Sequence, residues 1–270
     1  MYRISQNQLK ILTQCPRKYQ YIYLDNFASP FTLAEQEKLA WGKKFHLLMQ
    51  QRELGLPMDS ILAENPEMQR CYQALIQTAT DLFTPSQPKE DILREAEHSR
   101  VLSFDNSLFT VIYDLLIADQ NNAKIIDWKS YPIPQNTQKL TRHWQTRLYL
   151  FVLVETSDYL PEEVSMTYWF VKPLGNQAPQ SLTIPYSQKQ HEETKADLKQ
   201  ILHNLTQWLE DYHTQKKPLT QVDINKGICQ SCQFATLCQR TQPSQRENLP
   251  NIASPDDVLK NLAIIEEISI

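Results

Sequence analysis

The pattern of hydrophobic and polar positions predicts helices over most of the first 83 residues. Ser5 followed by Gln8 is a capping-box pattern, in which each side chain bonds to the backbone of the other at a helix N-terminus. Apolar residues then recur three or four positions apart, at Leu9, Leu12, Cys15, Tyr19 and Ile22. The same spacing predicts further helices over about 33–54 and 66–83.

The pattern changes near residue 93, where short apolar runs are separated by polar turns. Strands are predicted over 93–104, 108–118, 124–129, 163–171 and 180–185. Helices with an apolar stripe are predicted over 140–155 and 187–213. This order of elements predicts an α/β fold with a small mixed sheet flanked by helices.

The composition is that of an ordinary globular protein, with 41% hydrophobic and 21% charged residues. No stretch reaches the roughly 18 apolar residues of a membrane span, and the polar start does not resemble a secretory signal, so we expect a cytoplasmic protein without membrane contact. The net charge of −4 argues against nucleic-acid binding over the whole surface. Residues 1–52 nevertheless carry eight Lys or Arg against three acidic residues, which permits a local phosphate-binding face.

An Asp-x-Lys motif on the third predicted strand carries the clearest chemical signal. Side chains alternate faces along a strand, so Asp127 and Lys129 share one face. Asp114 lies on the preceding strand, and the short turn between the strands allows it to lie beside Asp127. Adjacent carboxylates repel unless a cation lies between them, and Mg²⁺ or Mn²⁺ suits oxygen ligands. The pattern therefore favours a hydrolytic metal site, with a solvated surface hairpin as the alternative.

Three of the five cysteines lie close together near the end of the chain. Cys229, Cys232 and Cys238 follow a Cys-x2-Cys-x5-Cys spacing. An odd number of cysteines in a reducing compartment favours metal ligation over a disulfide framework. Three neighbouring thiolates repel unless a metal or cluster holds them, so a fourth ligand is expected, and the nearby candidates are poor.

The carboxylate motif resembles the core of the PD-(D/E)xK nuclease superfamily, in particular its RecB-like and AddB-type exonuclease domains. The resemblance rests on Asp114 followed by Ile-Ile-Asp127-Trp-Lys129. Gln145 and Tyr149, four positions apart and hence on one helical face, resemble the Q-x-x-x-Y motif that follows in this family.

Two motifs nearer the start extend the resemblance. Gly42-x-x-x-His46 is similar to a helix whose histidine is an additional metal ligand in the family. Cys15-Pro-Arg-Lys-Tyr is similar to the lone N-terminal cysteine of the AddB-type and CRISPR-associated iron–sulphur exonucleases. The resemblance implies that Cys15 joins the C-terminal trio on a [4Fe–4S] cluster, with Zn²⁺ as the alternative. One departure is Val111, which stands where the family usually has glycine.

The resemblance also implies a domain organisation. Residues 1–239 are expected to form a restriction-endonuclease-like core, with a helical portion over about 30–90 and an iron–sulphur segment at its C-terminal end. A linker and a short helix are expected over 240–270.

Roles for individual residues follow from the same resemblance. The expected catalytic residues are Asp114, Asp127, Lys129, Gln145 and Tyr149. The expected ligands of Mg²⁺ or Mn²⁺ are His46, Asp114, Asp127 and one glutamate, for which Glu97 is preferred and Glu95 is the rival. The expected cluster ligands are Cys15, Cys229, Cys232 and Cys238. Candidate DNA contacts are Arg17, Lys18, Lys43, Arg142 and Arg147.

The expected function is metal-dependent hydrolysis of DNA, as an exonuclease on single-stranded ends in repair or recombination. No Walker A pattern is present, so a helicase motor, or another repair or CRISPR partner, would be a separate chain. One alternative is a non-catalytic DNA- or protein-binding module that retains the nuclease fold and the metal cluster. Another is a zinc-ribbon protein without nuclease ancestry.

Overall fold

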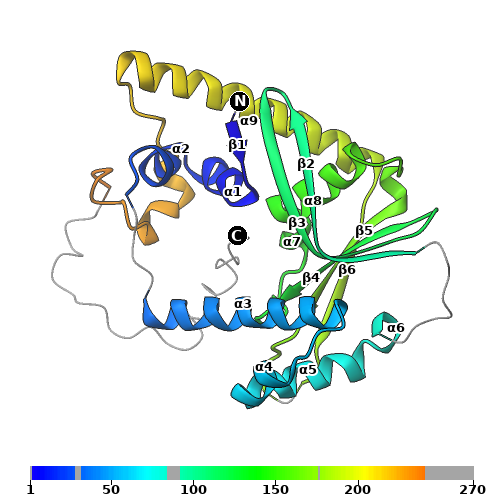
Figure 1. The fold of residues 1–270 in the computed structure, drawn as a ribbon. Helices are drawn as coiled ribbons and strands as arrows, with labels where there is room; N and C mark the ends of the chain where they lie inside the picture. The colour runs from blue at the N-terminus through cyan, green and yellow to red at the C-terminus, as the bar shows by residue number, and fades with distance from the viewer. Residues whose placement is uncertain (1, 28–31, 84–91, 176, 241–270) are drawn as a thin grey trace.

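The computed structural model of the chain describes residues 2–27, 32–83, 92–175 and 177–240. Within these ranges the centre is a six-stranded mixed sheet (Figure 1). Its strands are β1 (Tyr2–Ile4), β2 (Leu93–Phe104), β3 (Ser107–Ala118), β4 (Ala123–Lys129), β5 (Val164–Phe170) and β6 (Gln180–Pro185). On one side of β3, β2 pairs with it in antiparallel orientation. On the other side, β1 pairs with it in parallel and β4 in antiparallel orientation. The sheet then continues with β5 parallel to β4 and β6 antiparallel to β5.

The helices within the described ranges surround this sheet. They are α1 (Gln6–Gln14), α2 (Pro16–Tyr19), α3 (Leu33–Glu53), α4 (Asp59–Glu64), α5 (Pro66–Thr78), α6 (Thr80–Phe83), α7 (Gln138–Thr141), α8 (Trp144–Glu155) and α9 (Gln188–Gln215). Short helical turns are η1 (Gln20–Leu24), η2 (Pro161–Glu163), η3 (Ile224–Lys226) and η4 (Ile228–Ser231). No helix in the described part of the chain has both the length and the hydrophobicity that a membrane crossing requires.

Two hydrophobic cores cover the two faces of the sheet. The neighbouring residues Ile125 and Ile126 of β4 belong to different cores, as the alternation of side chains along a strand requires. The larger core packs β3, β4 and β5 against α1, α8 and α9, and the smaller one packs them against α3 and α5. Helix α3 therefore stands over one face of β4 and α8 over the other.

The predicted α/β fold with a small mixed sheet is confirmed, and the predicted strand bounds agree within one residue. The capping box of Ser5 and Gln8 is also present. The helix predicted over 66–83 is divided at Ala79, whose ψ of 45° leaves the helical region. The helix predicted over 140–155 is divided at His143, which is extended with ψ of 142°. The helix and most of the linker expected over 240–270 lie outside the described residues.

The two ends of the described chain meet. The backbone N–H of Arg17 donates to the carbonyl of Thr220 at 3.0 Å, and Arg17 Nε donates to the carbonyl of Leu219 at 2.7 Å. Gln20 Oε1 accepts from the backbone N–H of Leu219 at 2.8 Å. In Figure 1, α2 accordingly lies beside the orange segment that contains the C-terminal cysteines.

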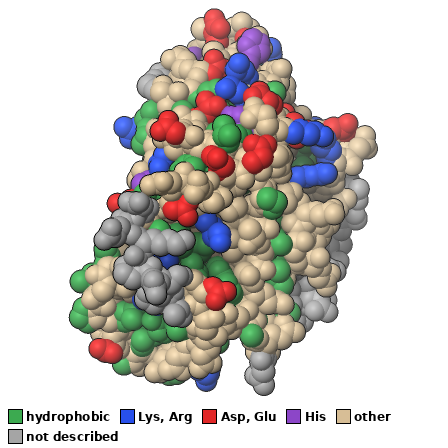
Figure 2. Space-filling model, turned by 90° about the vertical axis from the view of Figure 1, so that its right-hand side faces the viewer, with side chains coloured by type: hydrophobic (Ala, Val, Ile, Leu, Met, Phe, Trp, Pro, Cys, Tyr) green, Lys and Arg blue, Asp and Glu red, His purple; other side chains and the backbone are tan. Residues whose placement is uncertain are grey.

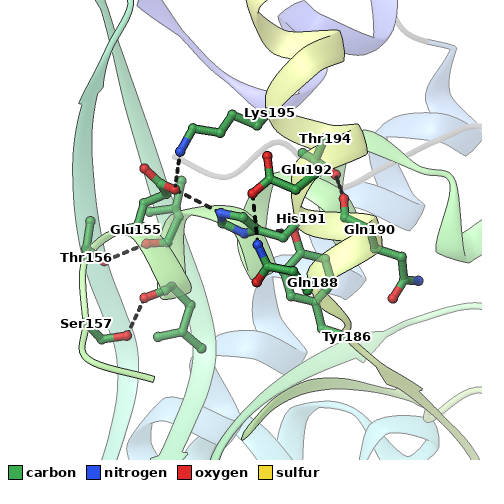
Figure 3. Close-up of polar contacts among 12 residues, drawn as sticks. Glu155, Thr156, Ser157, Tyr186, Gln188, Gln190, His191, Glu192, Thr194 and Lys195 are labelled. Carbon is green, nitrogen blue, oxygen red and sulfur yellow. Dashed lines mark hydrogen bonds and ion pairs between the residues drawn. The ribbon is translucent and has the colours of Figure 1, made fainter. Parts of the chain in front are cut away.

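A buried histidine joins the end of α8 to the first turn of α9 (Figure 3). His191 Nε2 lies 2.9 Å from Glu155 Oε1, and Lys195 Nζ lies 3.1 Å from the same oxygen. The imidazole also stacks on Phe151, with ring centroids 4.9 Å apart. A carboxylate at a helix C-terminus interacts unfavourably with the helix dipole. The two positively polarised partners of Glu155 offset this repulsion and link α8 to α9.

Candidate active site on strands β3 and β4

His46 on α3 and Asp114 on β3 face each other. Nδ1 of the imidazole lies 3.3 Å from Oδ1 of the carboxylate, and the two side chains are 19% and 12% exposed. The neighbours of His46 on α3, among them Phe45 and Leu48, are buried in the smaller core. This packing fixes the helix and therefore directs His46 at β3.

The peptide of Trp128 contacts both of these side chains. Its N–H donates to Asp114 Oδ2 at 2.7 Å, and its carbonyl oxygen lies 3.0 Å from His46 Nε2. A carbonyl can only accept, so Nε2 carries the proton of this hydrogen bond. In a neutral imidazole, Nδ1 then directs a lone pair at the carboxylate, an arrangement that a cation between them stabilises. Histidines that bind metals commonly donate their other N–H to a backbone carbonyl in this way.

Glu97 of β2 completes a group of three possible ligands. One ligand atom from each of His46, Glu97 and Asp114 lies within 4.8 Å of the others. Glu97 has a φ of 52°, a left-handed conformation that non-glycine residues rarely adopt. Backbone strain of this kind clusters at functional sites, where the surrounding structure maintains it.

Glu95, the rival ligand, lies in a different environment. Its side chain is 55% exposed and forms an ion pair with His98. Of the two glutamates on β2, Glu97 is the one that the structure brings to His46 and Asp114.

Asp127, Lys129 and Gln145 form a second, buried group. Lys129 Nζ donates to Gln145 Oε1 at 2.9 Å, and Gln145 Nε2 donates to Asp127 Oδ2 at 2.8 Å. Lys129 Nζ also lies 2.8 Å from Asp127 Oδ1, but outside hydrogen-bond geometry, so this buried oxygen has an ion-pair contact and no hydrogen bond. A buried carboxylate oxygen of this kind fits a metal ligand.

Burial raises the pKa of Asp127 to about 7. The positive charge of Lys129 opposes this shift, and the negative charge of Asp114 adds to it. Asp127 therefore holds its negative charge weakly near neutral pH, and a nearby cation would favour the ionised form.

The two groups adjoin each other across β3 and β4. The antiparallel register ends at the pair of Leu115 and Ile126, the residues that adjoin Asp114 and Asp127 in sequence. The negative charge of Asp114 contributes to the raised pKa of Asp127. Asp114 lies with His46 and Glu97, while Asp127 contacts Lys129 and Gln145 and is not part of that group of three within the described residues.

Tyr149, one turn after Gln145 on α8, is 2% exposed. Its ring packs edge-on against Tyr113, with centroids 5.3 Å apart, and its carbonyl accepts from the Tyr113 hydroxyl at 3.0 Å. Val111, at the position where the family usually has glycine, is buried in the larger core. The Q-x-x-x-Y motif thus places its glutamine at the carboxylates and its tyrosine in the adjoining core.

The candidate DNA contacts fall into two kinds. Lys43 and Arg142 are exposed. Arg147 forms an ion pair with Asp197 at 2.6 Å and, together with Arg142, lines a cavity of about 560 Å³ between α8, β6 and α9. Arg17 and Lys18 lie at the cysteine-rich end, where Lys18 lines the cavity between the cysteines. Figure 2 shows acidic and basic side chains intermingled over the upper part of one face, so local groups must carry any attraction for phosphate.

The four cysteines expected to share a cluster line one cavity. They are Cys15, Cys229, Cys232 and Cys238, and all are free thiols. Burial raises the pKa of the Cys238 thiol, and the neighbouring Cys15 and Cys232 thiols raise it further. Four sulphurs around one zinc ion would lie about 3.8 Å apart. Among the described residues, the thiols do not form a group of three within 4.8 Å, so their spacing is wider than a zinc tetrahedron.

A positively charged side chain, the guanidinium of Arg240, also lines this cavity. Arg240 Nη1 donates to Cys229 Sγ at 3.5 Å and to the carbonyl of Val222 at 2.5 Å. The fifth cysteine, Cys71, lies on α5 and takes no part in the cavity.

Two features of the site were not predicted from the sequence. One is the pair of contacts made by the Trp128 peptide, because backbone groups leave no signal in a sequence. The other is Tyr168 on β5, which pairs with Asp127 in the parallel register and lies with its ring centroid 5.3 Å from Lys129 Nζ. Its position becomes evident once the pairing of β4 with β5 is known.

The fold and the carboxylate–lysine groups define a domain of nuclease type. The sequence model described as PD-(D/E)XK nuclease superfamily matches residues 3–239, and the chain therefore belongs to the PD-(D/E)XK nuclease superfamily. This membership overturns the alternative of a zinc-ribbon protein without nuclease ancestry. No curated protein matches the sequence.

A solved structure shares the fold at low sequence identity. A protein described as "Putative exonuclease" from Eubacterium rectale is 10% identical, with a TM-score of 0.51 over 95% of this chain and 92% of that one. A protein named SSO0001 is 13% identical, with a TM-score of 0.37 over 89% of this chain and 87% of that one.

Proposed function

We propose that this nuclease hydrolyses DNA phosphodiester bonds with a divalent metal ion, Mg²⁺ or Mn²⁺. The observation that carries the proposal is the pair formed by His46 and Asp114, in which Nδ1 of the imidazole lies 3.3 Å from Oδ1 of the carboxylate. The Trp128 carbonyl contacts the other imidazole nitrogen, so Nδ1 is the nitrogen that would bind a cation.

The residues present fit such an ion. Carboxylate oxygens and one imidazole suit Mg²⁺ or Mn²⁺, and His46, Asp114 and Glu97 would hold it together with Asp127. Oδ1 of Asp127, which is buried and contacts Lys129 only as an ion pair, and the raised pKa of the carboxyl support this set. When bound, the ion would polarise a phosphoryl oxygen and acidify a water molecule.

The remaining residues act on the substrate and on the attacking water. Lys129 would orient that water or stabilise negative charge on the phosphoryl group in the transition state. Gln145 holds the Lys129 ammonium and the Asp127 carboxylate together and thereby fixes their relative position. Tyr149 would support α8 behind Gln145, and the exposed Lys43 and Arg142 would contact DNA phosphates.

The proposed substrate is single-stranded DNA, degraded from its ends in repair or recombination, with a helicase or another repair or CRISPR partner as a separate chain. Exonuclease rather than endonuclease activity is supported by the description of the Eubacterium rectale neighbour, which shares the fold. The proposed domain comprises residues 1–239, because the contacts of Arg17 and Gln20 with residues 219–220 join its two ends.

The test is cleavage of end-labelled single-stranded DNA with Mn²⁺, compared with the same reaction in EDTA. Lys129→Ala should abolish cleavage, whereas Lys124→Ala should not, because Lys124 lies on the same strand but is exposed. A wild-type protein that binds DNA without cutting it would favour the non-catalytic module. Equal rates for wild type and Lys129→Ala would overturn the proposed role of the lysine.

We further propose that Cys15, Cys229, Cys232 and Cys238 hold a [4Fe–4S] cluster, with Zn²⁺ as the alternative. The cavity that all four cysteines line supports this ligand set. The cluster would be structural, because it would close a loop of more than two hundred residues. Anaerobically purified protein should be brown, with absorbance near ~400 nm. Cys229→Ser should lose colour and iron and Cys71→Ser should keep both; a colourless wild type that contains zinc would reject the cluster.

A further inference from the structure

Tyr168 lies beneath the lysine of the proposed active site. It is on β5, pairs with Asp127 in register, and is fully buried. The centroid of its ring is 5.3 Å from Lys129 Nζ, within the range in which the electron-rich face of an aromatic ring attracts an ammonium ion. Lys129 itself is 3% exposed, so the ring replaces solvent beside the charge.

The hydroxyl of Tyr168 is anchored to the helix that supplies Gln145. Thr146 Oγ1 donates to the carbonyl of Leu140 at 2.6 Å and lies 2.7 Å from Tyr168 OH. The single hydroxyl proton of Thr146 is used at Leu140, so the Tyr168 hydroxyl donates to Thr146. Burial, with the nearby charge of Asp127, raises the pKa of Tyr168 well above its usual value, in keeping with a neutral donor.

The ammonium of Lys129 is therefore contacted by two kinds of group, oxygen atoms and an aromatic ring. Gln145 and Asp127 contact it with oxygen atoms, and the Tyr168 ring contacts it from β5. Thr146 follows Gln145 directly in α8, so a single helical turn positions both the oxygen contact and the ring. A displacement of this turn would move both supports together.

We infer that Tyr168 is a positioning residue for Lys129, held in place by Thr146. The inference rests on the proposed function in assigning Lys129 a part in cleavage, but the contact itself can be tested without cleavage. Loss of the ring removes the attraction that confines the ammonium, whereas loss of the hydroxyl alone leaves the ring in place. Tyr168→Leu should therefore have a larger effect than Tyr168→Phe.

The first measurement is acylation of lysine amines in the folded protein, followed by mass spectrometry of peptides. In Tyr168→Leu, Lys129 should react about 2- to 30-fold faster than in wild type, the range that corresponds to a cation–π contact. Tyr168→Phe should stay close to wild type, and the exposed Lys189 provides an internal reference. Phe109→Leu is the matched control, because it removes a buried ring from the same core without touching Lys129.

The second measurement is the kinetics of cleavage by the same variants. Tyr168→Leu should lower kcat by about 2- to 30-fold with KM unchanged, because the ring acts on the lysine and not on bound DNA. Unchanged acylation of Lys129 in Tyr168→Leu, or an equal increase in Phe109→Leu, would overturn the inference whatever the cleavage assay gives.

The two measurements separate this inference from the proposed function. Faster acylation of Lys129 without any cleavage by the wild type would reject the nuclease mechanism and retain the Tyr168 contact. If Tyr168→Leu does not fold, Tyr168→Met provides the test, because its flexible unbranched side chain fills the space of the ring without offering an aromatic face. It should raise the acylation rate of Lys129, and an unchanged rate would overturn the inference.

Discussion

His46 Nε2 lies 3.0 Å from the carbonyl oxygen of Trp128, the residue between Asp127 and Lys129. This contact ties a helix of the N-terminal part directly to the strand that bears the Asp-x-Lys motif. It also fixes which imidazole nitrogen faces Asp114. The backbone of β4 therefore sets the orientation of the histidine before any ion is bound. Because the side chain is already ordered, ion binding has a smaller entropic cost.

Replacement of His46 should weaken metal binding. His46→Ala removes one ligand and should raise the Mn²⁺ concentration for half-maximal cleavage by about 10- to 100-fold, with partial recovery of kcat at high Mn²⁺. The measurement is a Mn²⁺ titration of cleavage, together with calorimetry of Mn²⁺ binding. His203→Ala on the exposed side of α9 serves as the control and should match wild type. Identical titrations for His46→Ala and wild type would remove His46 from the ligand set.

The two glutamates of β2 should differ sharply. Glu97→Gln should lower the affinity for Mn²⁺, because Glu97 lies with His46 and Asp114, whereas Glu95→Gln should change it little. Calorimetric titration of both variants checks this order. A stronger effect of Glu95→Gln would exchange the two assignments.

The backbone of Glu97 adds a prediction about stability. At a φ of 52°, glycine avoids the steric cost that a side chain meets, so Glu97→Gly should raise the free energy of unfolding of the metal-free protein by about 1 kcal/mol. The same change should reduce metal-dependent cleavage. Chemical denaturation in EDTA measures the first effect. A destabilised Glu97→Gly protein would show that the strain at this residue is relieved in some other way.

The raised pKa of Asp127 predicts that the free energy of unfolding of the metal-free protein falls as the pH rises. Its pKa is raised from about 3.8 to about 7 in the folded chain, chiefly by burial, so the native state holds a proton that the unfolded chain has released across this window. The metal-free protein should therefore lose stability, by a few kcal/mol at most, as pH rises from about 4 to 7. Thermal melts in EDTA between pH 5 and 8 should show this decline in Tm. Mn²⁺ should restore more stability at pH 8 than at pH 5, and equal gains at both would count against Asp127 as a ligand.

Strands β2 to β6 and most helices could be predicted from the sequence, because their apolar positions repeat with clear periods. Strand β1, three residues long, is not among the predicted strands. The breaks at Ala79 and His143 could not, since the apolar pattern continues through both and the interruption arises from tertiary packing. Within the site, the short turn between two strands predicts that Asp114 and Asp127 lie near each other, and the charge of Asp114 does act on Asp127.

Other parts of the site depend on contacts between distant segments. His46 and Glu97 reach Asp114 from elements separated from it in sequence, and only family resemblance suggested them. The choice between Glu97 and Glu95 required the backbone conformation, because both residues lie on the same predicted strand. Arg147, a predicted DNA contact, forms an ion pair with Asp197, a partner that no local pattern indicates.

The contact between α8 and α9 should contribute to stability and not to catalysis. His191 is buried, stacks on Phe151 and lies 2.9 Å from Glu155 at the end of α8 that is remote from Gln145 (Figure 3). His191→Ala should leave a cavity and remove one of the two partners of the Glu155 carboxylate, at a cost of about 2–3 kcal/mol, and lower Tm by roughly 4–12 °C. His203→Ala on the same helix is the matched control and should leave Tm unchanged. Cleavage at 25 °C should remain at the wild-type rate, because Gln145 keeps its contacts with Lys129 and Asp127. An unchanged Tm would show that His191 adds nothing to the packing of α8 against α9. A large loss of kcat would show that this contact also affects the position of Gln145, at the other end of α8.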